Sequence, residues 1–147
     1  MLYLVDTNVL LRLAERTHPL HAIARTAIRK LRRSGHQLQI TSQNCIEFWN
    51  VATRPKDRNG LGLTPSDADR LLRLIERLFP RLPDTPDMYP EWRRLVVAHG
   101  VSGVQVHDAR LVAVMRTNGV AHILTFNADD FTRYTRIGIV AVSPTIV

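Results

Sequence analysis

Short runs of apolar residues alternate along this chain with longer segments in which apolar residues recur every three or four positions. The short runs predict β-strands at residues 2–5, 38–41, 123–125 and 139–142, with a shorter one near Arg81 and Leu82. The periodic segments predict helices over about residues 7–16, 19–33, 42–52, 65–79, 91–99 and 107–118. Strands that alternate with amphipathic helices are typical of an α/β fold, in which helices cover both faces of a mainly parallel sheet.

Local signals mark the ends of several predicted helices. Pro19 is expected in the first turn of the second helix, which Ser34 and Gly35 end. Thr64 is expected to cap the helix that begins at Pro65. Because the chain has 147 residues and no repeat or low-complexity tract, we expect all of it to form a single domain.

The chain carries only 13 Asp and Glu residues, few enough to assign a place to each. Eight are explained by exposed helix faces, helix starts or turns: Glu15, Asp57, Asp67, Asp69, Glu76, Asp84, Asp87 and Glu91. Five remain: Asp6, Glu47, Asp108, Asp129 and Asp130. Ligands of parallel sheets bind beyond the carboxyl ends of the strands, so acids close to those ends are candidates for a functional site.

The first two of these acids differ in how strongly they indicate a functional site. Asp6 directly follows the first predicted strand, and capping of the next helix explains it equally well. Glu47 shares a polar band with Gln43, Asn50 and Arg54, which spans only about 60° of a helix that turns 100° per residue. Such a narrow band with one acid predicts a buried polar site rather than a surface pair of Glu47 with Arg54.

The remaining three acids lie in the second half of the chain. Asp108 begins a helix whose apolar face should pack on the sheet, and helix capping is again the alternative. His107 beside it is interpreted as structural or substrate-contacting, not as a metal ligand. Asp129 and Asp130 follow the strand that ends at Thr125, where turn chemistry explains Asp129 better than Asp130.

Charge and ligand type indicate what a cluster of such acids would do. Carboxylates gathered at neighbouring strand ends repel one another unless a cation joins them. Oxygen ligands, with no cysteine pair and no paired histidines, favour Mg²⁺ or Mn²⁺. The chain also carries 20 Lys and Arg and a net charge of +7, and guanidinium groups pair well with phosphate, although solubility or codon usage could also explain them. The combination favours metal-assisted cleavage of a phosphodiester.

Four segments resemble, in order, the motifs of the PIN-domain family and of its VapC-like branch. They are Val-Asp-Thr-Asn at 5–8, Glu-Phe-Trp-Asn-Val-Ala-Thr-Arg-Pro at 47–55, Val-His-Asp-Ala-Arg-Leu-Val-Ala at 106–113 and Leu-Thr-Phe-Asn-Ala-Asp-Asp-Phe at 124–131. The resemblance covers nearly the whole chain. It implies a three-layer α/β/α sandwich and an Mg²⁺- or Mn²⁺-dependent endoribonuclease specific for single strands, the toxin of a toxin–antitoxin pair.

The resemblance also implies roles for individual residues. Asp6, Glu47 and Asp108 match the first three acids of the family site, and Asp6 and Asp108 are expected to hold the metal most directly. The fourth acid is open, because Asn127 stands where many relatives carry an acid. We expect Asp130, which precedes a phenylalanine, to complete the site.

Four further residues are expected to support the acids. Thr7 and Asn8 should support Asp6 through their hydroxyl and amide groups, and Thr125 and Asn127 should line the site.

The resemblance implies three partners: an RNA substrate, a cognate antitoxin whose tail enters the acidic pocket, and a second copy of the chain in a homodimer. The single Cys45 excludes an internal disulfide framework. The first residues predict neither a secretory signal nor an anchor, and no apolar run predicts a membrane span, so a cytoplasmic location is expected.

Rival interpretations keep an α/β fold but change the activity. A catalytically degenerate PIN domain that binds RNA or protein as a scaffold is favoured by Asn127. A receiver-like phospho-acceptor domain needs a lysine near its last strand, and neither Lys30 nor Lys56 is so placed. A DNA-directed, structure-specific nuclease is disfavoured by the small size of the chain.

Overall fold

A four-stranded parallel sheet runs through the centre of the computed structural model, which describes all 147 residues. The strand order is β2–β1–β3–β4, with bounds β1 (Leu2–Val5), β2 (Gln37–Gln39), β3 (His122–Leu124) and β4 (Val140–Val142). In the middle of the sheet, Tyr3 pairs with Leu38 on one side and with His122 on the other. The short strand expected near Arg81 is reduced to one parallel bridge to Ile40.

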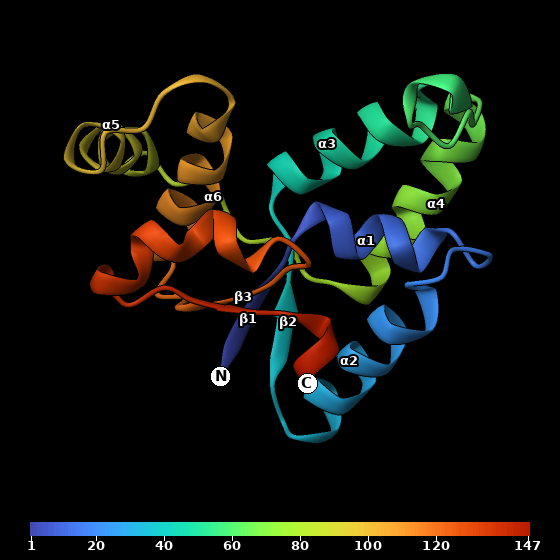
Figure 1. Cartoon of the computed structure of the whole chain (residues 1–147), viewed down its shortest axis with the longest axis horizontal. Helices are drawn as coiled ribbons and strands as arrows, with labels where there is room; N and C mark the ends of the chain where they lie inside the picture. The colour runs from blue at the N-terminus through green and yellow to red at the C-terminus, as the bar shows by residue number, and fades with distance from the viewer.

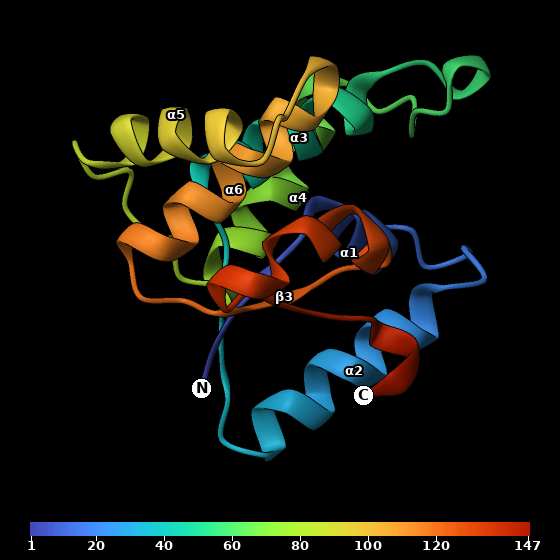
Figure 2. The ribbon, with the colours of Figure 1, turned by 60° about the vertical axis from the view of Figure 1, so that its left-hand side comes forward.

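Helices cover both faces of this sheet, as expected for a three-layer α/β/α sandwich (Figure 1). The α-helices are α1 (Thr7–Ala14), α2 (His21–Arg33), α3 (Ser42–Thr53), α4 (Pro65–Leu78), α5 (Met88–Ala98) and α6 (Val106–Thr117). Short 3-10 helices are η1 (Lys56–Arg58), η2 (Gly103–Gln105), η3 (Ala128–Ile137) and η4 (Pro144–Ile146). Figure 2 shows α6 on one side of the sheet with α5 lying over it, while α1 and α2 lie on the other side.

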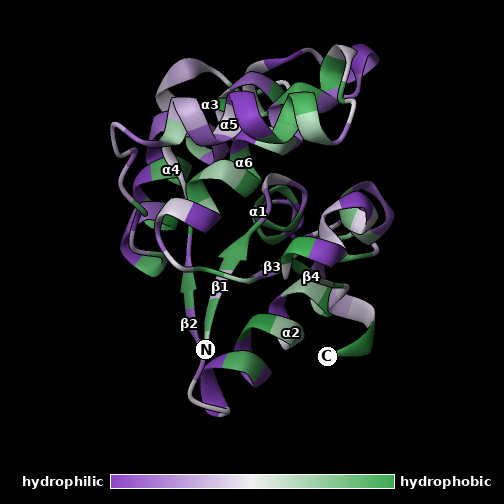
Figure 3. Ribbon diagram, turned by 90° about the vertical axis from the view of Figure 1, so that its left-hand side faces the viewer, coloured by the Kyte–Doolittle hydropathy of each residue, from purple (hydrophilic) through white to green (hydrophobic).

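The first strand is buried between two apolar cores. Side chains alternate between the faces of a strand, so Tyr3 and Val5 enter the core under α1 to α4 while Leu4 enters the core under α5 and α6. Figure 3 shows β1 as a mostly hydrophobic strand, whereas the edge strand β2 has hydrophilic residues on both sides of Leu38. Burial on both faces fixes the direction of β1 and therefore the position of the residue that follows it.

Two helices begin at other residues than the sequence predicts. α2 begins at His21 and not at Pro19, because the preceding residues form a turn in which the Leu20 backbone N–H donates to the His18 ring at 3.0 Å. α5 begins at Met88, three residues earlier than expected, and holds Pro90 in its first turn, where proline loses no hydrogen bond. The expected cap is confirmed at Thr64, whose side chain accepts from the Asp67 backbone at 3.2 Å.

The segment Ala128–Ile137 was not predicted to be helical. It forms a 3-10 helix in which Phe131 and Tyr134 are buried. A 3-10 helix has three residues per turn, so these two side chains point to the same side, toward the core under α6. No helix of the chain is both long enough and apolar enough to cross a membrane.

Candidate active site

Asp6 lies at the carboxyl end of β1, at the start of α1, and only 8% of its surface is exposed. Its carboxylate accepts hydrogen bonds from the Thr7 backbone N–H at 2.7 Å and from the Thr125 hydroxyl at 2.7 Å. The side-chain amide of Asn8 lies 3.4 Å from the same carboxylate. Asp6 is therefore the N-cap of α1, as the alternative interpretation expected, and it is also the only acid of the chain that is buried.

A polar network ties Asp6 to the segment that follows β3. The Asn8 amide donates to the Thr125 hydroxyl oxygen at 3.1 Å, and its carbonyl oxygen accepts from the Phe126 backbone at 3.1 Å. The Asn127 backbone N–H donates to the same Thr125 oxygen at 3.0 Å. The contact of Asn127 with this network is through its backbone, and its side chain is exposed.

Glu47 lies one turn into α3 and is held at both oxygens. Thr7 donates from its hydroxyl to Oε2 at 3.0 Å, and Gln43 donates from its amide to Oε1 at 2.7 Å. Asn44 in turn donates to the Thr7 hydroxyl oxygen at 3.1 Å. Glu47 forms no ion pair with Arg54, so the polar band of α3 runs from the buried Gln43 into the site.

Asp108 is the third residue of α6, so the expectation that it could be a helix cap is wrong. The helix begins at Val106, and the capping position falls on Gln105. Asp108 is half-buried in the first turn, where the helix dipole favours a negative charge. His107 before it is exposed and turns its carbonyl oxygen toward Gln43.

The acids act on one another electrostatically. Burial raises the pKa of Asp6 to about 6, against hydrogen bonds from Thr125 and Thr7 that lower it, and Asp108 and Glu47 raise it further. Burial also raises the pKa of Asp108 to about 6, and the neighbouring charges of Asp130 and Glu47 add to this effect.

One cation counters the charge around Asp108: Arg133 lowers its pKa. Asp129 is not among the charges that act on Asp108, whereas the exposed Asp130 of η3 is. The structure therefore brings Asp6, Glu47, Asp108 and Asp130 into one electrostatic group.

The donor set suits a hard divalent cation. No three His, Cys, Asp or Glu side chains converge into a ready-made metal site anywhere in the chain. Mg²⁺ does not require one, because it keeps several waters and is held by one or two carboxylates. A cation between Asp6 and Asp108 would also relieve the burial and repulsion that raise both pKa values. These two residues could hold such an ion.

A cleft of about 510 Å³ opens beside these acids, between α3 and the start of α6. Its lining residues are Gln43, Ile46, Glu47, Asn50, His107, Asp108 and Arg110. Sequence reasoning missed Arg110, although a lone charge before the fully buried stretch from Leu111 to Met115 was a usable signal. It also missed Asn44, whose buried contacts with Thr7 depend on how α3 meets α1.

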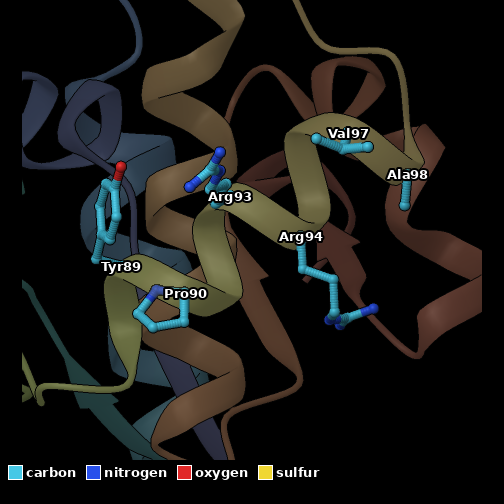
Figure 4. A pocket seen from close by; sticks show the side chains of 6 residues that line it. All are labelled: Tyr89, Pro90, Arg93, Arg94, Val97 and Ala98. Atoms are coloured by element: carbon cyan, nitrogen blue, oxygen red, sulfur yellow. The ribbon is translucent and has the colours of Figure 1, made fainter.

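A second hollow, of about 540 Å³, lies along α5 and carries a different chemistry (Figure 4). It is lined by Tyr89, Pro90, Arg93, Arg94, Val97 and Ala98. None of the four grouped acids lines it, and Arg94 is already paired with Glu91 at 2.6 Å. The cleft beside Asp108 is therefore the candidate active site.

Comparison with known proteins identifies the family. The sequence model of the PIN domain matches residues 3–137. Ribonuclease VapC27 of Mycobacterium tuberculosis (strain ATCC 25618 / H37Rv) is 34% identical over 138 residues, which are 92% of this chain and 91% of that protein.

Two solved structures share the fold. VapBC2 from Rickettsia felis, bound to a DNA fragment from its promoter, has a TM-score of 0.68 at 11% identity, over 97% of this chain and 98% of that chain. VapC20 from Mycobacterium tuberculosis, a sarcin-ricin-loop-cleaving toxin, has a TM-score of 0.65 at 19% identity, with the same coverage. The chain belongs to the PIN-domain family, and it is similar over nearly its whole length to a VapC-type ribonuclease.

Proposed function

We propose that this chain is an Mg²⁺- or Mn²⁺-dependent endoribonuclease specific for single strands, and that it is the toxin of a toxin–antitoxin pair. One observation carries the proposal: acids from four separate elements, Asp6, Glu47, Asp108 and Asp130, form one electrostatic group beyond the carboxyl ends of parallel strands. Two names support it, since the relative VapC27 is called a ribonuclease and the structural neighbour VapC20 is called a sarcin-ricin-loop-cleaving toxin.

In this mechanism Asp6 and Asp108 hold the cation. When bound, the cation supplies positive charge for the phosphate and lowers the pKa of a water molecule. Asp6 is held in one orientation by Thr125 and the Thr7 backbone, so it is preorganised. Glu47 is oriented by hydrogen bonds at both oxygens. We assign it to complete the cation pocket, directly or through a water molecule, and to accept the proton of the attacking water.

The surroundings of the acids suit an RNA strand. Arg110 lines the same cleft, and Arg133 lies close enough to Asp108 to affect its pKa. Guanidinium groups pair with phosphate oxygens in a two-pronged geometry, and the chain carries a net charge of +7. His107, exposed at the mouth of the cleft, is assigned a contact with the substrate.

Cleavage of a labelled single-stranded RNA pool tests the activity, with purified protein in Mg²⁺, Mn²⁺ or EDTA. Asp6→Asn and Asp108→Asn should each lower cleavage by about a hundredfold or more, because each removes a charge that serves the transition state. Asp57→Asn, an exposed acid in η1, is the matched control and should cleave as the parent does. Full activity in a folded Asp6→Asn protein, or cleavage that persists in EDTA, would contradict the proposal.

A catalytically degenerate PIN domain that acts as an RNA- or protein-binding scaffold is the second candidate. It is favoured by Asn127, an exposed amide at a position where many relatives carry an acid. Titration with Mn²⁺ discriminates between the two candidates, because a scaffold does not need an affinity for the ion that Asp6→Asn abolishes.

We further propose that an antitoxin binds this chain, and that two copies of the chain form a homodimer. A groove of about 370 Å³ between α1, α2 and α4 supports the first of these. It is lined by Leu13, Arg25, Ile28, Arg29, Arg32, Arg33, Leu78 and Phe79, with Arg32 stacked over Phe79 at 5.0 Å. Four arginines around an apolar floor suit an acidic amphipathic segment.

The proposed homodimer is tested by light scattering of the purified protein, which should give about twice the chain mass of 16.7 kDa.

A further inference from the structure

The side-chain amide of Gln43 forms three hydrogen bonds. The sequence predicted this residue only as part of a polar band. It is buried, with 5% of its surface exposed. Its nitrogen lies 2.7 Å from Glu47 Oε1 and 2.8 Å from the carbonyl oxygen of His107. Its oxygen accepts from the Arg110 guanidinium at 3.0 Å. A primary amide has two N–H donors, so both donated bonds can form together.

These partners allow only one orientation of the amide. Rotating it by half a turn would direct its oxygen at two other oxygens, those of Glu47 and His107. It would also direct its N–H groups at the guanidinium of Arg110, which can only donate. Arg110 therefore acts together with these two acceptors to keep the nitrogen end of the amide at Glu47.

The same amide connects two elements that carry acids of the site. Gln43 and Glu47 lie one turn apart on α3, and His107 is the residue before Asp108 on α6. The bond to His107 spans 64 positions of sequence. One side chain thus links the Glu47 carboxylate to the backbone that places Asp108.

Arg110 is itself held in place on its other side. Its Nη2 lies 3.9 Å from Asp84 Oδ1, and the Ser42 hydroxyl donates to the other oxygen of that carboxylate. A chain of polar contacts therefore connects Asp84, Arg110, Gln43 and Glu47. Only Glu47 belongs to the group of four acids.

We propose that Gln43 and Arg110 are positioning residues of the active site. Gln43 fixes the Glu47 carboxylate relative to Asp108, and Arg110 holds the oxygen end of the Gln43 amide. The predicted effect on cleavage rests on the proposed ribonuclease function, whereas the predicted effect on metal affinity does not. A merely structural link between α3 and α6 would stabilise the fold without acting through Glu47.

A double-mutant cycle with Glu47→Gln separates positioning from structure, with Mn²⁺ affinity by calorimetry and RNA cleavage as the two readouts. Gln43→Leu keeps the volume and removes the hydrogen bonds, and Gln43→Glu keeps an acceptor for Arg110 but sets a carboxylate against Glu47. Both should weaken Mn²⁺ binding and cleavage by about tenfold or more in the parent. In the Glu47→Gln background, Gln43→Leu should change the Mn²⁺ affinity and the cleavage rate by less than about twofold each.

Arg110→Met should give a smaller loss in the same direction, and no further loss in a Gln43→Leu background. Gln37→Leu and Arg93→Met are matched controls, because both residues are exposed and neither contacts the site. If Gln43→Leu does not fold, the cycle of Arg110→Met with Glu47→Gln carries the test. Circular dichroism and thermal melting establish folding for each variant.

The two proposals fail in distinguishable ways. An equal loss in the parent and Glu47→Gln backgrounds, or no loss in a folded Gln43→Leu protein, would overturn the positioning inference even if RNA is cleaved. Mn²⁺ affinity that depends on Gln43 only when Glu47 is present supports the inference even if the parent cleaves no RNA. A parent that neither binds Mn²⁺ nor cleaves RNA would overturn both.

Discussion

The burial of Asp6 has an energetic cost that a bound cation would remove. Its pKa is raised to about 6 from an ordinary value of 3.8, so the folded chain holds the proton more tightly than the unfolded chain. Ionisation therefore lowers stability: the cost is absent below about pH 3.8, grows toward pH 6 and is complete above it. A shift of about two units corresponds to about 3 kcal/mol.

Asp6→Asn should accordingly be more stable than the parent in EDTA at pH 7.5, by up to about 3 kcal/mol, and similar to it at pH 4. Because the Thr125 oxygen already accepts from Asn8 and Asn127, the new amide keeps its oxygen toward the Thr125 hydroxyl and loses the bond from the Thr7 backbone, which makes the gain smaller than this upper value. Thermal or urea melts at the two pH values measure this, with Asp57→Asn as the unchanged control. Adding Mn²⁺ should stabilise the parent but not the variant. A variant less stable than the parent at pH 7.5 without metal would contradict the inferred cost of burying the ionised Asp6 carboxylate.

At the scale of single residues, the sequence indicated the acids and the residues that contact Asp6, but not what orients Glu47. Asp6 follows a strand, Glu47 lies on a narrow polar band and Asp108 lies at the start of a helix, and a linear pattern can reveal each of these places. The role of Gln43 depends on the approach of His107 from a distant helix, and no local spacing encodes that approach.

At the scale of elements, the loop after α3 is fastened to the helix end by backbone bonds. The Gly62 N–H donates to the Arg54 carbonyl at 2.9 Å, and the Leu61 N–H donates to the Val51 carbonyl at 3.0 Å. This loop brings the chain so close to α3 that a Cβ on Gly60 would lie 1.9 Å from the Arg54 carbonyl oxygen.

Gly60→Ala should therefore cost about 3 kcal/mol or more, because backbone atoms and not a flexible side chain would have to move. Gly35→Ala is the matched control: its added methyl meets nothing within 4 Å, and only its φ of +83° is unfavourable, so about 1 kcal/mol is expected. Urea unfolding of both variants makes the comparison. Equal destabilisation would show that the close approach of the loop is not maintained in solution.

The predicted elements were right where the spacing of apolar residues and the length of the segment indicated the same element. They were wrong where residues typical of turns form part of a helix. The strands and the helices α3, α4 and α6 followed from buried runs and a 3.6-residue period. The segment Ala128–Ile137 begins with residues typical of turns, and only two buried aromatics, three positions apart, organise its 3-10 helix. A sequence pattern with only two buried positions does not distinguish a short helix from a loop.

At the scale of the whole molecule, the positive charge should govern how the chain meets RNA. Affinity for a polyanion falls with salt because binding releases counterions. With three or more phosphates contacted, raising salt from 50 to 200 mM should weaken binding of single-stranded RNA by about tenfold or more. The inactive Asp6→Asn protein, titrated by fluorescence anisotropy, makes the measurement without cleavage. Affinity independent of salt would point to recognition without phosphate contacts.

The order of strands in the sheet also determines when the site can exist during synthesis. Asp6 directly follows β1, yet the Thr125 hydroxyl that binds it, just after the neighbouring strand β3, comes 119 positions later. A ribosome making this protein therefore releases the first acid long before the residues that orient it. In the nascent chain, Asp6 therefore stays without its Thr125 partner until the residues between them have been translated.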